Sequence, residues 1–230
     1  MNAINHAATS LLIKKKYPHV PLVPILISVQ LIEMLWVILN ILGVERTDYA
    51  ATVSSLADIH LVHMPFSHSV AFTLLWAALA GFVVARVLKK PGWALAVMIG
   101  VCSHIVLDII THAFDIEIVP FAGLPEIGSG LYAVPVAALL FELGYAVVIW
   151  RLVDGSRFLL WALLLLNLSS LSFYLPQLKG PESLLSQHPD WFAPVIGVHI
   201  LFGLLCVFLL SRYEARFAAK KVGPATEGAL

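Results

Sequence analysis

Six long apolar stretches limit the folds that this chain can adopt. Each has the length of about 20 residues that a helix needs to cross the hydrocarbon core of a bilayer. They run over Leu22–Leu42, Ser69–Leu88, Trp93–Phe114, Gly130–Trp150, Phe158–Leu175 and Phe192–Ser211. Of the 230 residues, 60% are hydrophobic and only 12% are charged, a composition typical of polytopic membrane proteins. We therefore predict an all-α membrane bundle with about six transmembrane helices.

The distribution of basic residues predicts how these helices are oriented. Lysine and arginine are enriched on the cytoplasmic side of membrane proteins. If the N-terminus is cytoplasmic, 12 of the 14 basic residues lie on that side, and only Arg46 and Lys179 lie opposite. The 12 are Lys14, Lys15, Lys16, Arg86, Lys89, Lys90, Arg151, Arg157, Arg212, Arg216, Lys220 and Lys221. The sequence thus predicts a multi-pass inner-membrane protein with both termini in the cytoplasm.

The domain organisation follows from the placement of the apolar stretches. We predict one transmembrane domain over residues 1–221 and a short disordered tail over residues 222–230. Residues 1–150 contain most of the polar groups that lie within spans, and residues 151–221 add two further spans. The first 13 residues, Met1–Ile13, are too short to span but apolar enough to bury. They form either a half-helix tucked into the bundle or a helix on the membrane surface.

Composition excludes some classes of function. Formal net charge is zero, so there is no basic surface to neutralise the phosphates of a nucleic acid. Cys102 and Cys206 both lie in apolar stretches, without the spacing of a zinc finger or a disulfide framework. Neither a glycine-rich phosphate loop nor a nucleophilic Ser-His-Asp signature is present.

Three ionisable residues lie four apart within a single predicted span. His104, Asp108 and His112 fall on one face of the helix over Trp93–Phe114. Ionisable groups are costly in hydrocarbon, so they usually face the bundle interior and mark a functional site. The two histidines are about 12 Å apart along the axis, too far to share one metal ion, but Asp108 lies between them and can serve both. This pattern favours a metal site with one or two ions over a polar seam that merely orders the bundle.

Other ionisable residues fall at a similar depth. Glu33 and Glu142 lie near the midplane of their spans, His68 lies at the outer mouth of the second span, and His63 lies in the loop before it. Either glutamate is a ligand or acid–base group, or it is a protonated acid that donates a hydrogen bond to a neighbouring helix. His199 is expected to be a satisfied core histidine. The polar groups therefore cluster between the midplane and the outer face.

Imidazole and carboxylate ligands are typical of zinc and related divalent ions. Such an ion lowers the pKa of bound water to about 7, and two ions about 3.5–4 Å apart clamp the oxygens of a phosphoester. These residue types thus favour metal-dependent hydrolysis of a phosphoester. Three alternatives remain at this point: an ion or proton-coupled transporter, a haem-binding redox protein, and a non-catalytic membrane scaffold.

The motifs resemble those of a known family. The stretches His63-Met-Pro-Phe-Ser-His68-Ser69, Ser103-His104-Ile-Val-Leu-Asp108 and Thr111-His112 are similar to those of the membrane-bound metal-dependent hydrolases of the YdjM type. That family is grouped with zinc-dependent phospholipase C and the single-strand-specific P1-type nucleases. The resemblance covers about residues 2–150, and the last two spans contain no matching motif.

The resemblance implies a set of site residues and a reaction. The implied metal ligands are His6, Glu33, His63, His68, His104, Asp108 and His112. Of these, His63 and His112 support the site or add a second ion. At Glu33 the sequence departs from the family, which more often has an aspartate within a Pro-Asp-x-Asp run at this place. Glu142 or His112 is expected to accept the proton of the activated water. The implied cofactor is zinc, one or two ions, and the implied substrate is a membrane lipid or other amphiphile that enters sideways, with the site opening toward the periplasmic face.

Overall fold

The computed structural model describes residues 1–49, 58–175, 177, 178, 180 and 188–222. Apart from Val222, the tail predicted over residues 222–230 lies outside these described residues, so its disorder stays a prediction. The α-helices are α1 (Ala3–Lys16), α2 (Leu22–Val29), α3 (Leu31–Ile41), α4 (Val70–Phe82), α5 (Pro91–Thr111), α6 (Pro135–Leu152), α7 (Arg157–Leu168) and α9 (Phe192–Val222). Shorter helical turns are η2 (Val83–Val87), η3 (Leu131–Ala133), η4 (Leu171–Phe173) and η5 (Pro189–Trp191).

The described residues contain four helices that are long and apolar enough to span a membrane, or five if a bent pair is counted as one span. The four are Val70–Val87, Pro91–Thr111, Pro135–Leu152 and Phe192–Phe217. The bent pair is α2 with α3, which meet at an angle of 50° around Gln30. The number therefore falls short of the six spans that we predict from the sequence.

The missing sixth span is α7. This helix has 12 residues, which gives a rise of about 18 Å, well short of the core thickness of about 30 Å. The chain leaves the helix at Ser169, whose hydroxyl donates to the carbonyl of Leu166 at 2.6 Å. Serine competes with helical hydrogen bonds in this way, so the apolar character of Phe158–Leu175 overstates the length of the helix.

Capping residues explain where several helices begin. The Ser69 side chain accepts from the backbone N–H of Phe72 at the start of α4, and Ser156 does the same for Leu159 at the start of α7. Proline stands in the first turn of α5 and of α6, where its missing N–H has no helical partner to lose.

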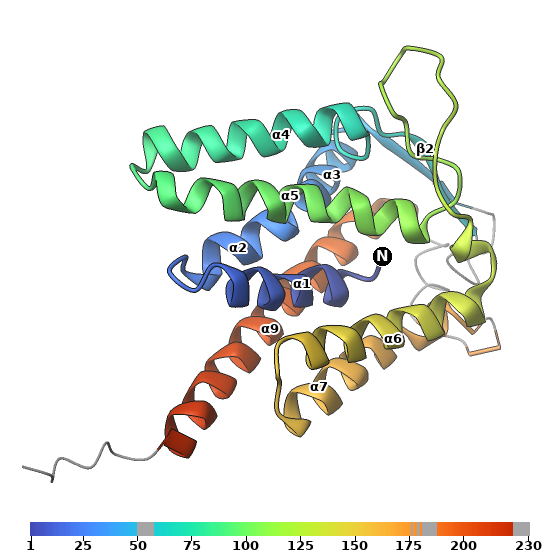
Figure 1. Ribbon diagram of the computed structural model, residues 1–230. Coiled ribbons are helices and arrows are strands. Elements are labelled where there is room, and N and C mark those ends of the chain that lie inside the picture. Colours follow the sequence, from blue (N-terminus) through green and yellow to red (C-terminus); the bar gives the residue numbers. More distant parts are fainter. Residues whose placement is uncertain (50–57, 176, 179, 181–187, 223–230) are drawn as a thin grey trace, which may run out of the picture.

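Helix α1 lies at the centre of the bundle. It contacts α2, α5, α6, α7 and α9, and its start, marked N, lies among the other helices (Figure 1). Ile4, Ala7 and Ala8 have no exposed surface. Small side chains allow this close packing. Of the two alternatives for the first residues, the structure has the buried half-helix and not the surface helix.

The C-terminal end of α1 is fastened to the turn between α6 and α7. Lys15 donates to the carbonyl of Leu152 at 2.7 Å and to Asp154 Oδ2 at 2.5 Å. This ammonium group lowers the pKa of the exposed Asp154 carboxyl by hydrogen bonding and charge attraction. The α1–α2, α4–α5 and α6–α7 turns all lie toward the left end of the bundle (Figure 1). Most of the basic residues, namely Lys14, Lys15, Lys16, Arg86, Lys89, Lys90, Arg151 and Arg157, lie in or next to these turns.

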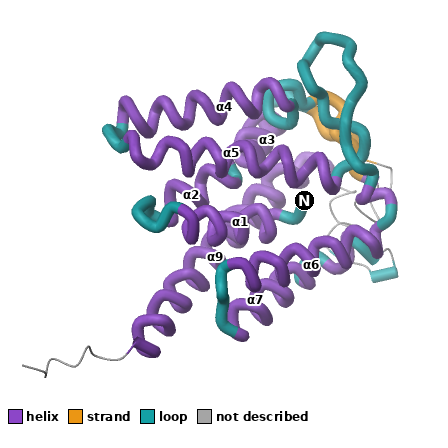
Figure 2. The backbone as a smooth tube through the Cα atoms, in the orientation of Figure 1, coloured by secondary structure: helices purple, strands orange, loops and turns teal. Residues whose placement is uncertain are grey.

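One two-stranded ribbon interrupts the helical architecture (Figure 2). Strand β1 (Arg46–Tyr49) pairs antiparallel with β2 (Ile59–His63), with Arg46 opposite His63. The all-α prediction did not include this ribbon. It brings Glu45, just before β1, next to the turn that leads from β2 into α4.

Candidate metal site

The structure brings five of the predicted ligands together in the interior of the bundle. They are His6 on α1, Glu33 on α3, His68 just before α4, and His104 and Asp108 on α5. Four of them are at most 3% exposed; Glu33 is partly buried. The resemblance implied His6 from the far N-terminus, and the central position of α1 explains how this residue reaches the others.

In the first part of the site, one oxygen of each of two carboxylates lies near the same two histidine nitrogens. Glu33 Oε2 lies 3.2 Å from both His68 Nε2 and His104 Nε2. Asp108 Oδ2 lies 3.1 Å from His104 Nε2 and 3.8 Å from His68 Nε2. These four atoms come from α3, from the turn before α4 and from α5, and no helix supplies more than two of them.

The hydrogen bond on the far side of His104 fixes which ring nitrogen points at the carboxylates. His104 Nδ1 lies 2.9 Å from the carbonyl oxygen of Val29, which only accepts hydrogen bonds, so Nδ1 carries the proton and donates. Val29 is the last residue of α2, where the break at Gln30 occurs. In the neutral imidazole the Nε2 lone pair then faces Glu33 and Asp108, which are acceptors as well.

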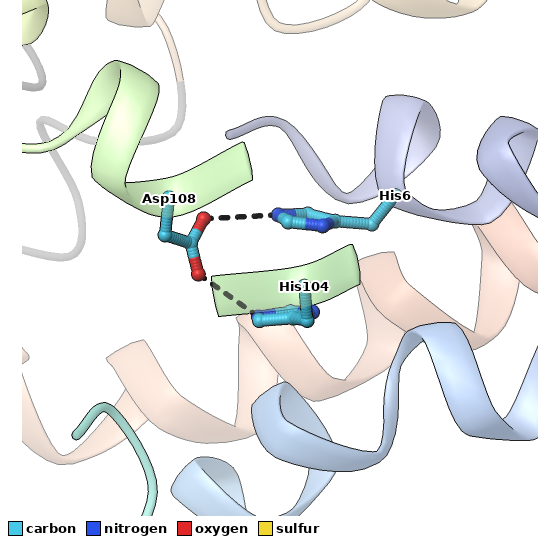
Figure 3. A group of neighbouring side chains, drawn as sticks. All are labelled: His6, His104 and Asp108. Carbon is cyan, nitrogen blue, oxygen red and sulfur yellow. Dashed lines mark hydrogen bonds and ion pairs between the residues drawn. The ribbon is translucent and has the colours of Figure 1, made fainter. Parts of the chain in front are cut away.

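The other oxygen of Asp108 faces a second set of groups. Asp108 Oδ1 lies 2.7 Å from the Met1 α-amino group, 3.1 Å from His6 Nε2 and 3.7 Å from His112 Nε2. The His6 and His104 rings stack with centroids 3.9 Å apart, and each points at a different oxygen of the same carboxylate (Figure 3). Asp108 thus lies between two groups of nitrogen atoms, one at each of its oxygens. The sequence placed it between His104 and His112 on one helix face.

The residues fit a divalent metal ion such as zinc. Donor atoms around a tetrahedral zinc ion at about 2.0–2.1 Å are about 3.3–3.4 Å apart, close to most of the spacings around Glu33 Oε2 and Asp108 Oδ2. Asp108 Oδ2 is buried and makes no hydrogen bond among the described residues; its nearest nitrogen neighbour there is His104 Nε2 at 3.1 Å. Buried carboxylate oxygens normally have a partner, so this one is suited to a cation.

Two other predicted ligands, His63 and His112, lie apart from this cluster, as does His199, which was expected to be a core histidine. His63 is exposed at the end of β2, where its ring lies 6.4 Å from the Phe121 ring, and the structure does not bring it to the other ligands. His112 follows the last residue of α5 and reaches only the Asp108 Oδ1 side. His199 on α9 lines a cavity next to the site.

Glu142 belongs to a separate hydrogen-bond network. Its Oε1 accepts from the backbone N–H of Asn2 at 2.9 Å and from the hydroxyls of Tyr132 and Tyr174 at 3.3 and 3.2 Å. Its Oε2 accepts from Asn5 Nδ2 at 2.5 Å. These bonds hold the start of α1, and with it His6, against α6.

A cavity of about 320 Å³ opens beside the cluster. Glu33, His68 and His112 are among the polar residues that line it. Most of the remaining wall is apolar and comes from α3, η4 and α9; its larger side chains are Trp36, Phe173, Phe192, Val195 and Ile196. A mostly apolar cavity that reaches the candidate site suits a ligand with one polar and one apolar part.

Comparison with known families places the chain. The family model described as YdjM inner membrane protein matches residues 38–178, more than half of the sequence. The chain belongs to this family. Its membership and its apolar helices make it a multi-pass inner membrane protein. No curated protein and no solved structure matches the chain.

The YdjM match includes most, but not all, of the predicted site. Within it lie His63, His68, His104, Asp108, His112 and Glu142. His6 and Glu33 precede the matched residues, so their place beside His104 and Asp108 rests on the geometry of α1 and α3. The description of the YdjM family names a location and no reaction.

Proposed function

We propose that this YdjM-family protein is an integral-membrane metal-dependent hydrolase that cleaves a phosphoester of a lipid or other amphiphile. The observation that supports this most is that Glu33 Oε2 and Asp108 Oδ2 both lie within 3.8 Å of His68 Nε2 and His104 Nε2, beside a mostly apolar cavity that Glu33 and His68 line. The proposal extends to zinc as the metal, with one or two ions, and to the relationship with phospholipase C and P1-type nucleases.

A zinc ion bound there would supply a water of lowered pKa and would attract the phosphoryl oxygens. The chain's own residues hold and orient the reacting groups. Asp108 presents its two oxygens to two sets of donors. His112, partly exposed and lining the cavity, is the better placed of the two proposed proton acceptors. The other, Glu142, already accepts four hydrogen bonds and positions α1.

The shape of the cavity supports an amphiphilic substrate. Its apolar wall would accommodate an acyl or alkyl chain while the phosphoester lies against the ligand end. We further propose that the cytoplasm adjoins the end of the bundle with the basic turns, so that the site lies nearer the periplasmic face. The stacked His6 and His104 rings are 3.9 Å apart, which leaves no room for a haem between them.

Metal analysis of the purified protein tests the proposal. We expect one or two zinc ions per chain in the wild type and a loss of at least one ion in His104→Ala, because this change removes a donor that lies within 3.2 Å of two carboxylates. His199→Ala is the matched control, since it removes a histidine that lines the cavity and belongs to neither group of potential ligands. Equal metal content in wild type and His104→Ala would contradict the proposal.

The proposed substrate class is tested by filling the cavity. Ile196→Trp adds bulk to the apolar wall, so we expect KM for a long-chain phospholipid to rise about tenfold with zinc content unchanged. Hydrolysis of a short water-soluble phosphodiester should change much less. Val198→Trp is the control, because Val198 is 68% exposed on the same helix and does not line the cavity. An equal effect on both substrates would argue against a lipid substrate.

A further inference from the structure

A buried carboxylate and a serine lie behind His68, on the side away from the metal site. Glu45 is 2% exposed, and its Oε2 accepts the hydroxyl of Ser67 at 2.5 Å. Ser67 Oγ lies 2.9 Å from His68 Nδ1. His68 Nε2, across the ring, lies 3.2 Å from Glu33 Oε2. A chain of contacts therefore runs from Glu45 through Ser67 and His68 to the metal site.

The number of donor protons available determines the direction of each hydrogen bond between Glu45, Ser67 and His68. Glu45 also accepts the backbone N–H groups of Phe66 and Ser67, each at 2.8 Å, so three donors surround it and it acts purely as an acceptor. The only hydroxyl proton of Ser67 is thereby used. Its oxygen must accept from His68, so Nδ1 of His68 carries the ring proton. The Nε2 lone pair is then free to face the metal site.

We propose that Glu45 and Ser67 are positioning residues that hold His68 in the tautomer required for metal binding. The metal itself rests on the proposed function. Ligating histidines in proteins usually donate their second N–H to a carboxylate or carbonyl, which fixes the ring and raises its basicity. His104 has such a partner in the carbonyl of Val29. For His68 the carboxylate acts through one intervening hydroxyl.

The amide variant Glu45→Gln tests the direction of the hydrogen bonds between Glu45, Ser67 and His68. In Glu45→Gln the side-chain oxygen can still accept the two backbone N–H groups, so the turn keeps its support. The amide nitrogen then donates to Ser67 Oγ, which frees the serine hydroxyl to donate to His68 Nδ1. This moves the ring proton to Nε2, where it blocks the lone pair that faces Glu33.

The experiment is titration of the purified, metal-stripped full chain with Zn²⁺ alone, alongside the visible absorption spectrum of the Co²⁺-loaded protein. Glu45→Gln and Ser67→Ala should each weaken Zn²⁺ binding about 10–100-fold and alter the Co²⁺ bands. Ser67→Thr keeps the hydroxyl and should restore most of the affinity. The double variant Glu45→Gln with Ser67→Ala should bind Zn²⁺ no more weakly than Glu45→Gln alone. Without the Ser67 hydroxyl, the amide has no hydrogen bond to His68 whose direction it could reverse.

A similar pair elsewhere in the chain supplies the control. Glu214 accepts the backbone N–H of Ser156 at 2.8 Å and its hydroxyl at 2.5 Å, with no histidine attached. Ser156→Ala and Glu214→Gln should leave Zn²⁺ affinity unchanged. Wild-type affinity in both Glu45→Gln and Ser67→Ala would overturn the inference while leaving the proposed function intact. A wild-type chain that binds no Zn²⁺ would overturn both.

Discussion

Changing Asp108 to asparagine is expected to remove zinc from the protein and to abolish phosphoester hydrolysis. The change keeps the size of the side chain but removes its charge and one of its two acceptor oxygens. Those oxygens face His68 and His104 on one side and His6 and His112 on the other. Removing one partner of a buried charged group costs about 3–5 kcal/mol, so we expect zinc affinity to fall by at least about 100-fold.

Zinc titration and phosphodiester hydrolysis measure this effect. Asp154→Asn is the matched control, because it removes an exposed carboxylate whose partner is Lys15 at the far end of α1. Exposed ion pairs contribute little, so the control should retain wild-type zinc binding and activity. If Asp108→Asn kept full zinc content, Asp108 would not be a ligand.

The sequence predicted the parts of the site that lie on one helix or follow from depth. His104 and Asp108 are four residues apart, so helix geometry alone places them on one face. Glu33 and His68 followed from their depth in separate spans. The position of His6, and the hydrogen bonds that Glu142 of α6 makes to Asn2 and Asn5, depended on the path of α1, for which the sequence left two alternatives.

Other features leave no signal in a pattern of apolar stretches about 20 residues long. Strands β1 and β2 have four and five residues, so a pattern of 20-residue apolar stretches does not detect them. Glu45 lies next to β1 and is indistinguishable in sequence from a solvated loop charge. Its burial depends on the pairing of the two strands, which brings it to Ser67. The length of α7 was overestimated because apolar composition does not reveal where serine ends a helix.

A second large effect is expected from Gly100→Ala, through the packing of α2 against α5. A Cβ atom at this position would lie 1.9 Å from Ser28 Oγ and 2.9 Å from Ser28 Cβ. Overpacking of this kind costs about 1–3 kcal/mol and separates the helices. Val29, the residue after Ser28, supplies the carbonyl that fixes the His104 ring one turn away. We therefore expect both a lower melting temperature and weaker zinc binding.

Thermal unfolding in detergent and zinc titration distinguish this effect from a general intolerance of alanine in the membrane. Gly144→Ala, on an exposed face of α6, is the control, because a Cβ there meets nothing within 4 Å. It should be neutral. Ser28→Gly removes the atoms that clash, so the double variant Gly100→Ala with Ser28→Gly should recover zinc binding better than it recovers stability. Equal behaviour of Gly100→Ala and Gly144→Ala would show that the contact between α2 and α5 does not hold the His104 ring.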